Sequence, residues 1–272
     1  MNKFLEICSG IASTLISIAF LFIPENLFEK YKFMPNMSDE INIIVNRIVF
    51  ILGIIIISIA VSLIYMYLRK KIKIKGKNYI IQIEYGDINK IKKYKKVINF
   101  DECYTTTVGN APSDIKPTSI CGQYLLKNPN ININQLIHNA NLKASKTKSK
   151  FQGKVRYDSG KLVPNGEYLL MAFAKLDKNG LGNFFSYQEF IECLSVLWEE
   201  IDKYYGQEDV CIPILGSGLT RINGQSLTQQ ELLDIIIMSY KLSEHKIKKP
   251  YKLHIVCRKN DDFSINKIGE SL

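Results

Sequence analysis

The sequence predicts an α/β protein in which an N-terminal transmembrane hairpin of two helices precedes a three-layer αβα domain with a mixed sheet. Two long uncharged apolar runs lie within residues 1–68. From residue 78 onward, apolar strand-like runs alternate with segments of helical periodicity, the pattern of a sheet covered by helices. The net positive charge comes from this second part, because residues 1–68 hold four Lys and Arg against five Asp and Glu.

The clearest element is the run 48–68, IVFILGIIIISIAVSLIYMYL, which has no charged residue. A helix of this length spans about 30 Å, the thickness of the hydrocarbon core of a bilayer. The run 7–23, ICSGIASTLISIAFLFI, is also uncharged and just long enough to span. We therefore expect membrane spans at about 5–24 and 47–68. A signal peptide is the alternative for the first run, but its basic flank is the single Lys3 and no small-residue cleavage motif follows.

The flanking charges predict the orientation of this hairpin. Segment 69–77, RKKIKIKGK, holds six basic residues and no acid, whereas loop 24–47 holds three basic residues against four acids. Because positive flanks stay on the cytoplasmic side, we expect a multi-pass protein of the cell membrane with a cytoplasmic N-terminus. Segment 69–77 is then a basic juxtamembrane linker, and residues 78–272 form a cytoplasmic domain.

Cysteine, histidine and small residues add three expectations. The six cysteines form no CxxC pair, which favours free thiols in a reducing compartment. None of the three histidines has metal-ligand spacing with a cysteine, so we expect no metal site. The first apolar run carries small residues at positions 10, 12, 13, 17 and 19, which allow close helix packing. A homo-oligomer held through the membrane is therefore expected.

The cytoplasmic part shows strand and helix signals in alternation. Two helices are predicted from the capping boxes Ser186 with Glu189 and Thr228 with Glu231. A third helix is predicted at 132–143, and a fourth contains SICGQYLL, with Ser113, Thr118 or Ser119 as its cap. The polar, basic stretch 144–154 is predicted to be an exposed loop. Predicted strands lie at 79–85, 96–100, 167–176, 209–215 and 252–258, the last three being nearly continuous apolar runs typical of strands covered on both faces.

A glycine-rich turn, GSGLTR, follows the fourth predicted strand. In sheets of this kind ligands bind beyond the carboxyl ends of the strands. Gly216 and Gly218 can take positive φ and turn successive backbone N–H groups outward, which makes a concave nest for an anion. Arg221 can add a bidentate charge. The turn lacks the GK[ST] ending of a P-loop, and a plain strand-to-loop turn is the alternative.

Two further turns carry polar side chains at strand ends. Asp87 follows the first predicted strand in YGDIN, where its carboxylate can accept hydrogen bonds from an exocyclic amine. Asn99 and Asp101 lie at the end of the second predicted strand. The helix that begins near Ser119 would present its N-terminus to a phosphate. These turns together predict a site for a phosphate-bearing small molecule.

In this order the motifs resemble those of macro domains, which bind ADP-ribose: GDI at 86–88, VIN at 97–99 and GSG at 216–218. The longer pattern VINFDE…SICGQYL…YLLMAFAKLD…LW…IPILGSGLTRI resembles the macro domain of Thoeris antiphage-defence effectors, in which two transmembrane helices precede the macro domain. The resemblance covers about residues 78–260.

The resemblance implies a membrane effector rather than an enzyme. In such systems a partner protein with a TIR domain makes an ADP-ribose-type signal from NAD, thought in this branch to be histidine–ADP-ribose. The macro domain binds this nucleotide signal, and the membrane helices then assemble and disrupt the lipid bilayer. No separate cofactor and no nucleic-acid partner are implied.

The resemblance also assigns site residues. Asp87 would contact the adenine amine, and Ile88 would line the base pocket. Asn99 and Asp101 would lie near the distal ribose or the group attached to it. Cys121 departs from the family pattern, which has histidine in SIHGQ, so a polar role at this position is in doubt. The pyrophosphate would be cradled by Gly216, Ser217, Gly218, Leu219, Thr220 and Arg221.

Two other functions stay open at this point. The chain lacks the NAAN motif and the following glycine run of hydrolytic macro domains, so no catalytic residue is expected. A membrane-tethered ADP-ribosyl hydrolase or nucleotide-processing enzyme is nonetheless an alternative, with Asp101 as a base that lacks a second partner. The other is a structural tether whose 69–77 segment and lysine surface hold lipid or nucleic acid, with strong salt dependence.

Overall fold

A computed structural model describes residues 2–24, 26–30, 38–259 and 263–268 of the chain. Parts of the predicted 24–47 loop and of the predicted 78–272 domain lie outside these residues. The chain forms two compact units, Met1–Arg69 and Lys70–Leu272.

The first unit consists of helices α1 (Asn2–Phe22), α2 (Asn26–Glu29) and α3 (Asp39–Leu68), and α1 packs against α3. Two stretches, Phe4–Phe22 and Asp39–Leu68, are long and apolar enough to cross a membrane. Their apolar side chains are largely exposed, as in Phe22 with 80% of its surface accessible. A core helix of a soluble domain would bury these side chains, so the exposure fits a lipid-facing hairpin.

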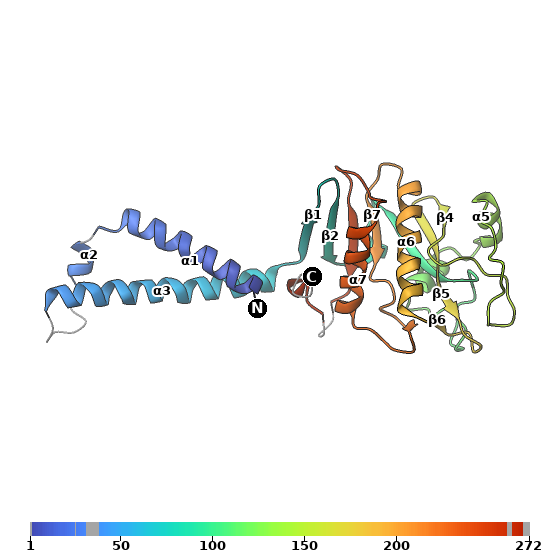
Figure 1. Ribbon diagram of the computed structural model, residues 1–272, viewed down its shortest axis with the longest axis horizontal. Helices are drawn as coiled ribbons and strands as arrows, with labels where there is room; N and C mark the ends of the chain where they lie inside the picture. Colours follow the sequence, from blue (N-terminus) through green and yellow to red (C-terminus); the bar gives the residue numbers. More distant parts are fainter. Residues whose placement is uncertain (1, 25, 31–37, 260–262, 269–272) are drawn as a thin grey trace. The chain divides into compact units, whose positions relative to one another are not determined.

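A nine-stranded sheet forms the centre of the second unit (Figure 1). Its order is β1-β2-β9-β7-β3-β5-β6-β8, with β4 also pairing with β5. The five neighbouring strands β2, β9, β7, β3 and β5 are parallel, whereas β1 runs antiparallel to β2, and β4 and β6 run antiparallel to β5. The prediction of a mixed sheet is therefore confirmed. The strands are β1 (Lys71–Lys75), β2 (Ile80–Tyr85), β3 (Lys95–Asp101), β4 (Leu162–Asn165), β5 (Tyr168–Leu176), β6 (Gly182–Phe184), β7 (Val210–Pro213), β8 (Arg221–Ile222) and β9 (Leu253–Cys257).

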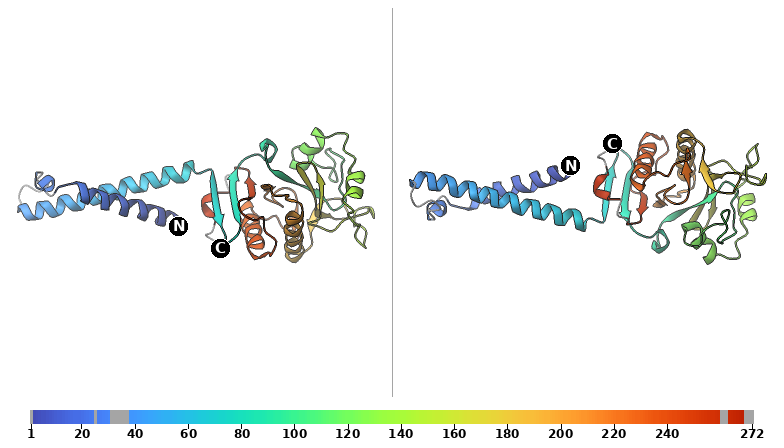
Figure 2. Two further views of the ribbon diagram at one scale, coloured as in Figure 1. Left: turned by 90° about the horizontal axis from the view of Figure 1, so that it is seen from above. Right: turned by 90° about the horizontal axis from the view of Figure 1, so that it is seen from below.

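Helices cover both faces of this sheet, as the two views of Figure 2 show. On one face α6 (Tyr187–Tyr204) and α7 (Gln229–Leu242) bury Trp198 and the apolar side of both helices. On the other face α4 (Ile120–Lys127) and α5 (Ile133–Asn139) pack over β3 and β5. The predicted three-layer αβα architecture is therefore confirmed. Two short 3₁₀ turns complete the unit, η1 (Ile88–Lys90) and η2 (Ile265–Lys267).

The helix starts follow from the capping residues in the sequence. Thr228 and Glu231 form the complete capping box, with the Thr228 side chain accepting from the Glu231 N–H and the Glu231 carboxylate accepting from the Thr228 N–H. Ser186 caps α6 through the Glu189 N–H at 3.1 Å. Of the three residues considered as the cap of α4, Ser119 fills the position.

The structure differs from expectation in segment 69–77. We expected a linker, but Lys71–Lys75 forms β1, which pairs antiparallel with β2. The sequence KIKIK alternates with the period of a strand, so Ile72 enters the core while the lysines stay exposed. Strands β4, β6 and β8 were also not predicted, since each has only two to four residues.

Candidate ligand-binding site

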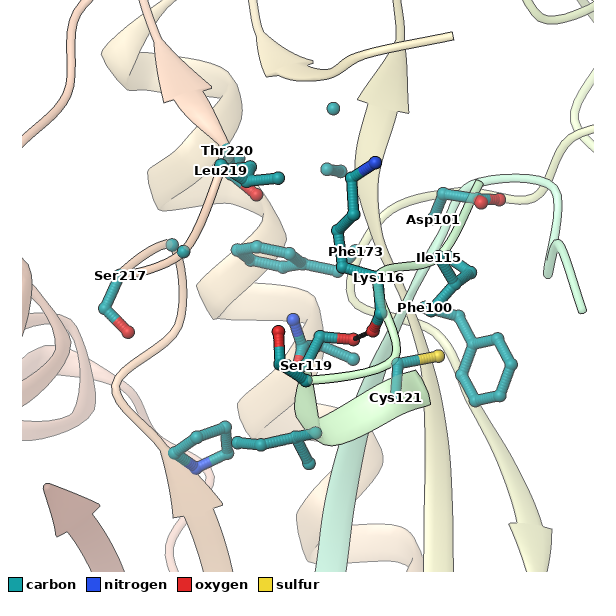
Figure 3. A pocket seen from close by; sticks show the side chains of 18 of the residues that line it. Phe100, Asp101, Ile115, Lys116, Ser119, Cys121, Phe173, Ser217, Leu219 and Thr220 are labelled. Carbon is teal, nitrogen blue, oxygen red and sulfur yellow. Dashed lines mark hydrogen bonds between the residues drawn. The ribbon is translucent and has the colours of Figure 1, made fainter. Parts of the chain in front are cut away.

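The parallel strands β2, β9, β7, β3 and β5 end at the same edge of the sheet, and a pocket of about 730 Å³ lies at this edge. Its volume is within the range of sites for small organic ligands, ~300–1,000 Å³. The pocket is lined by residues that follow or end these strands, including Asp87, Arg258, Gly216, Asp101 and Leu176. Figure 3 shows side chains from several elements converging on it.

The glycine turn after β7 offers unpaired backbone donors to the pocket. Gly216 has φ +86°, a backbone conformation that residues with a side chain rarely adopt. A Cβ there would also lie only 3.2 Å from Leu232, so both the conformation and the space favour glycine. The Ser217 N–H makes a long bond to the Ile214 carbonyl at 3.4 Å. Within the described residues, no protein acceptor takes the N–H groups of Gly216, Gly218, Leu219 or Thr220. These groups are free to bind an anion, as a nest requires.

The N-terminus of α4 lies across the pocket from this turn. Ser119 and Ser217 stand on opposite sides of the cavity in Figure 3. The Ser119 hydroxyl accepts from the Gly122 N–H at 3.0 Å and donates to the Lys116 carbonyl at 2.7 Å. A Cβ on Gly122 would lie 2.1 Å from that carbonyl, so only glycine fits here. The positive end of α4 and the glycine turn together favour a negatively charged group between them.

The Asp87 end of the pocket combines an exposed acid with an apolar wall. Asp87 caps η1, and its Oδ1 accepts from the Asn89 N–H at 3.0 Å. In the described structure its second carboxylate oxygen makes no hydrogen bond, so it is available to a donor on a ligand. Ile88, Pro213 and Val256 supply apolar surface beside it. An aromatic base with an exocyclic amine matches this combination.

The opposite end of the pocket holds Asn99 and Asp101. Asp101 is buried, and its Oδ1 accepts from the N–H groups of Cys103 at 2.8 Å and Thr105 at 3.2 Å. Burial raises the pKa of this carboxyl above its usual value. In Figure 3 the carboxylate points away from the glycine turn. Asp101 thus holds the turn after β3 in addition to lining the pocket.

Cys121 takes an apolar role. Its side chain is 4% exposed and packs with Ile98, Phe100 and Tyr124 in the core beneath α4. Burial raises the pKa of the thiol well above its usual value. The thiol therefore stays neutral, which fits its place among apolar side chains.

The structure brings together nine of the ten residues proposed from the sequence and leaves one outside. Arg221 does not line the pocket. It begins β8, is exposed, and its guanidinium donates a hydrogen bond to the Ser226 hydroxyl. Sequence reasoning missed several lining residues. Arg258 directly follows β9, so the strand-end rule would have found it, whereas Phe173 lies within an apolar run that carries no such signal. The missed residues include Lys116, Phe173, Gln229 and Arg258.

Within the described ranges, no three His, Cys, Asp or Glu side chains are grouped to hold a metal ion. Lys116 donates to the carbonyls of Asn110 and Ala111 at 2.8 and 3.0 Å, which braces the loop that forms one wall of the pocket. The site thus combines backbone donors, two cationic side chains (Lys116 and Arg258), three carboxylates (Asp87, Asp101 and Asp114) and apolar surface. The free backbone donors of the glycine turn suit an anionic group of an organic ligand.

Comparison with known proteins gave matches to a family model, to a relative and to solved structures. The family model described as "Thoeris protein ThsA, Macro domain" matches residues 81–258. Thoeris protein ThsA of Bacillus amyloliquefaciens (strain Y2) is 27% identical over 225 residues, covering 79% of this chain and 75% of that protein. Among solved structures, the Oceanobacillus iheyensis macrodomain with ADP covers 71% of this chain and 90% of its own, with 10% identity and a TM-score of 0.41. The macrodomain of Thermus aquaticus DarG covers 66% and 98%, with 13% identity and a TM-score of 0.39.

Proposed function

The chain belongs to the family of the Thoeris protein ThsA macro domain, and from this membership we propose that it is the ligand-binding membrane effector of a Thoeris antiphage-defence system. Its macro domain binds an ADP-ribose-derived signal, histidine–ADP-ribose, made by a partner protein with a TIR domain. The membrane helices then associate with those of other copies and disrupt the cell membrane. One observation carries the proposal: unpaired N–H groups of the glycine turn line a ligand-sized pocket beside the N-terminus of α4.

The proposed ligand follows the pocket from end to end. Asp87 accepts from the adenine amine, and Ile88 packs against the base. The diphosphate lies between the glycine turn of 216–220 and the first turn of α4, where backbone donors and the helix dipole favour its charge. Asn99 and Asp101 border the distal ribose and the group attached to it. Arg258, near Asp87, adds positive charge that Arg221 does not bring to the pocket.

We propose a cell-membrane location with two spans, and with the N-terminus and the macro domain in the cytoplasm. The support is the apolar surface of α1 and α3 and the excess of basic residues directly after α3. Gly10, Ser13 and Ser17 of α1 are exposed in the first unit, and small residues of this kind allow helices of different copies to approach closely. Association of several copies through these helices is part of the proposal.

The side chains of the pocket support binding rather than turnover. Three acids line it, and a carboxylate oxygen of each accepts a hydrogen bond from backbone N–H groups of its own turn. Asp87 accepts from Asn89, Asp101 from Cys103 and Thr105, and Asp114 from Ala111. Hydrolysis needs a base that is free to orient water at the reacting bond. An acid that already holds its own loop is poorly placed for that role.

Calorimetry on the full chain in detergent tests the proposal with ADP-ribose and histidine–ADP-ribose as ligands. Gly218→Glu is the decisive variant, because a Cβ at Gly218 meets nothing within 4 Å. We therefore expect the variant to fold, while its new carboxylate repels the diphosphate at the backbone donors of the turn. We expect affinity to fall at least ~100-fold, which corresponds to ~2.7 kcal/mol.

Asn134→Glu on the exposed surface of α5 is the matched control, since it adds the same charge away from the pocket. Equal affinity in wild type and Gly218→Glu would refute the site. Chromatography of the same mixtures tests the alternative: steady conversion of the ligand would identify a hydrolase instead.

A further inference from the structure

A second charged surface lies at the edge of the sheet, on β1. Lys71, Lys73 and Lys75 alternate with Ile72 and Ile74, so the isoleucines face the core and the three lysines share the opposite side. All three lysines are exposed. We call this set the lysine face.

The acid nearest to the lysine face is already engaged. Glu84 on β2 is the register partner of Lys71. One of its carboxylate oxygens lies 2.8 Å from Nδ1 of His254, and the other accepts from Gln82 at 2.9 Å. Among the described residues, no carboxylate lies within ion-pair distance of Lys71, Lys73 or Lys75.

Some lysines of the same unit form ion pairs with acids. Lys96, Lys161 and Lys175 each pair with a glutamate at 2.7–3.1 Å. The lysine face is therefore a concentration of charge that the protein does not neutralise itself. Its charge also continues into the turn after β1, where Lys249 donates to the carbonyls of Gly76 and Lys77 at 2.9 and 3.1 Å rather than to an acid.

The lysine face is tied closely to the membrane helix along the chain. Only Arg69 and Lys70 separate the end of α3 from the start of β1. Two residues reach at most ~7 Å. Clustered lysines directly after a membrane span are attracted to anionic headgroups, and this attraction acts within about one Debye length, ~8 Å in physiological salt.

We propose that the lysine face docks onto anionic phospholipid headgroups, so that β1 rests on the cytoplasmic surface of the membrane. The inference rests on the proposed crossing of the membrane by α3. The anionic headgroups are opposite in charge to the three lysines of this edge strand. The β1 segment would thus contact the membrane in addition to forming part of the sheet. The partner is a lipid surface, recognised through its phosphates.

Lysine acetylation by a water-soluble acylating reagent, followed by mass spectrometry, tests this on the full chain in nanodiscs. We expect Lys71, Lys73 and Lys75 to react at least ~5-fold more slowly in discs with phosphatidylglycerol than in discs of phosphatidylcholine alone. Adding 0.5 M KCl should restore their rates, because salt screens the attraction. Lys143, Lys146 and Lys148, exposed on another loop, should react equally in all discs. Equal rates for the lysine face in both lipids would overturn the proposal.

A pair of variants separates docking from general charge. We also expect Lys77, which is exposed and lies two residues after the lysine face, to react more slowly in phosphatidylglycerol discs. In K71Q/K73Q/K75Q this slow reaction of Lys77 should disappear, whereas K143Q/K146Q/K148Q, with the same loss of charge, should retain it. Loss in both variants would contradict a specific face. Resistance of the wild-type chain to carbonate extraction is scored separately: extraction of the chain would refute the membrane crossing, while retention with equal labelling would refute the lysine face alone.

Discussion

At the residue scale, the pocket shows how one side chain can serve the fold and the site together. Asp101 ends β3, borders the pocket and holds the next turn through two backbone N–H groups. Because it is buried, its carboxyl has a raised pKa, and desolvation is the main cause. A carboxyl with a raised folded-state pKa lowers stability as the pH rises above its unfolded value, since the folded protein then disfavours the charge.

Asp101→Asn should therefore gain stability relative to wild type as the pH rises from about 4 to 7, because the amide keeps the acceptor oxygen without the charge. Urea unfolding followed by the fluorescence of Trp198 measures this, since Trp198 is the only tryptophan and lies in the second unit. Asp177→Asn is the control: Asp177 also accepts from two backbone N–H groups, but in an exposed loop, and no such gain is expected. A variant that loses stability towards pH 7 would contradict the prediction.

Nine of the ten residues proposed from the sequence line the pocket because one rule applies to them. Asp87, Asn99 and Gly216 each lie at or beyond the carboxyl end of a strand that its apolar run makes recognisable. The prediction for Arg221 was wrong because this residue belongs to β8 and its side chain is exposed. A strand of two residues has no periodicity from which it could be predicted. Phe173 lies inside β5 and reaches the pocket only through the packing of the sheet.

At the scale of elements, α4 is the short helix on which the site depends. It has eight residues, and its cap fixes the turn that faces the glycine turn. Long elements were predictable because their periodicity is sustained, as in α6 and β5. The edge strands were not, since each is short, and β1 in particular carries charges that also serve as an orientation signal for the membrane.

Removing the cap of α4 should therefore affect both stability and binding. Ser119→Ala should cost about 1 kcal/mol of unfolding free energy and weaken ligand affinity by roughly 5-fold. Ser186→Ala removes the equivalent cap of α6, which does not line the pocket, so it should lower stability alone. Urea unfolding and calorimetry on both variants give the comparison. Equal loss of affinity in the two variants would assign the effect to stability rather than to the site.

At the scale of the whole molecule, the chain joins an apolar helical unit to a macro domain. The sequence predicted this division from the contrast between uncharged runs and the basic, alternating remainder. It did not predict that the sheet begins only two residues after α3, because the basic segment 69–77 was interpreted as a linker.

The proposed topology has a direct test in living cells. Green fluorescent protein fused to either terminus should fluoresce, because both termini are expected in the cytoplasm. Alkaline phosphatase placed in the connection between α2 and α3 should be active, because this connection is expected on the far side of the membrane. Active phosphatase at the N-terminus would reverse the orientation and remove the macro domain from the compartment of its proposed signal.

The direct succession of α3 and β1 has a mechanical consequence. With only Arg69 and Lys70 between them, the end of α3 and the start of β1 cannot move far apart. A long flexible linker would let the two elements separate. Because the connection is short, any displacement of β1 that exceeds its reach must also displace the end of α3.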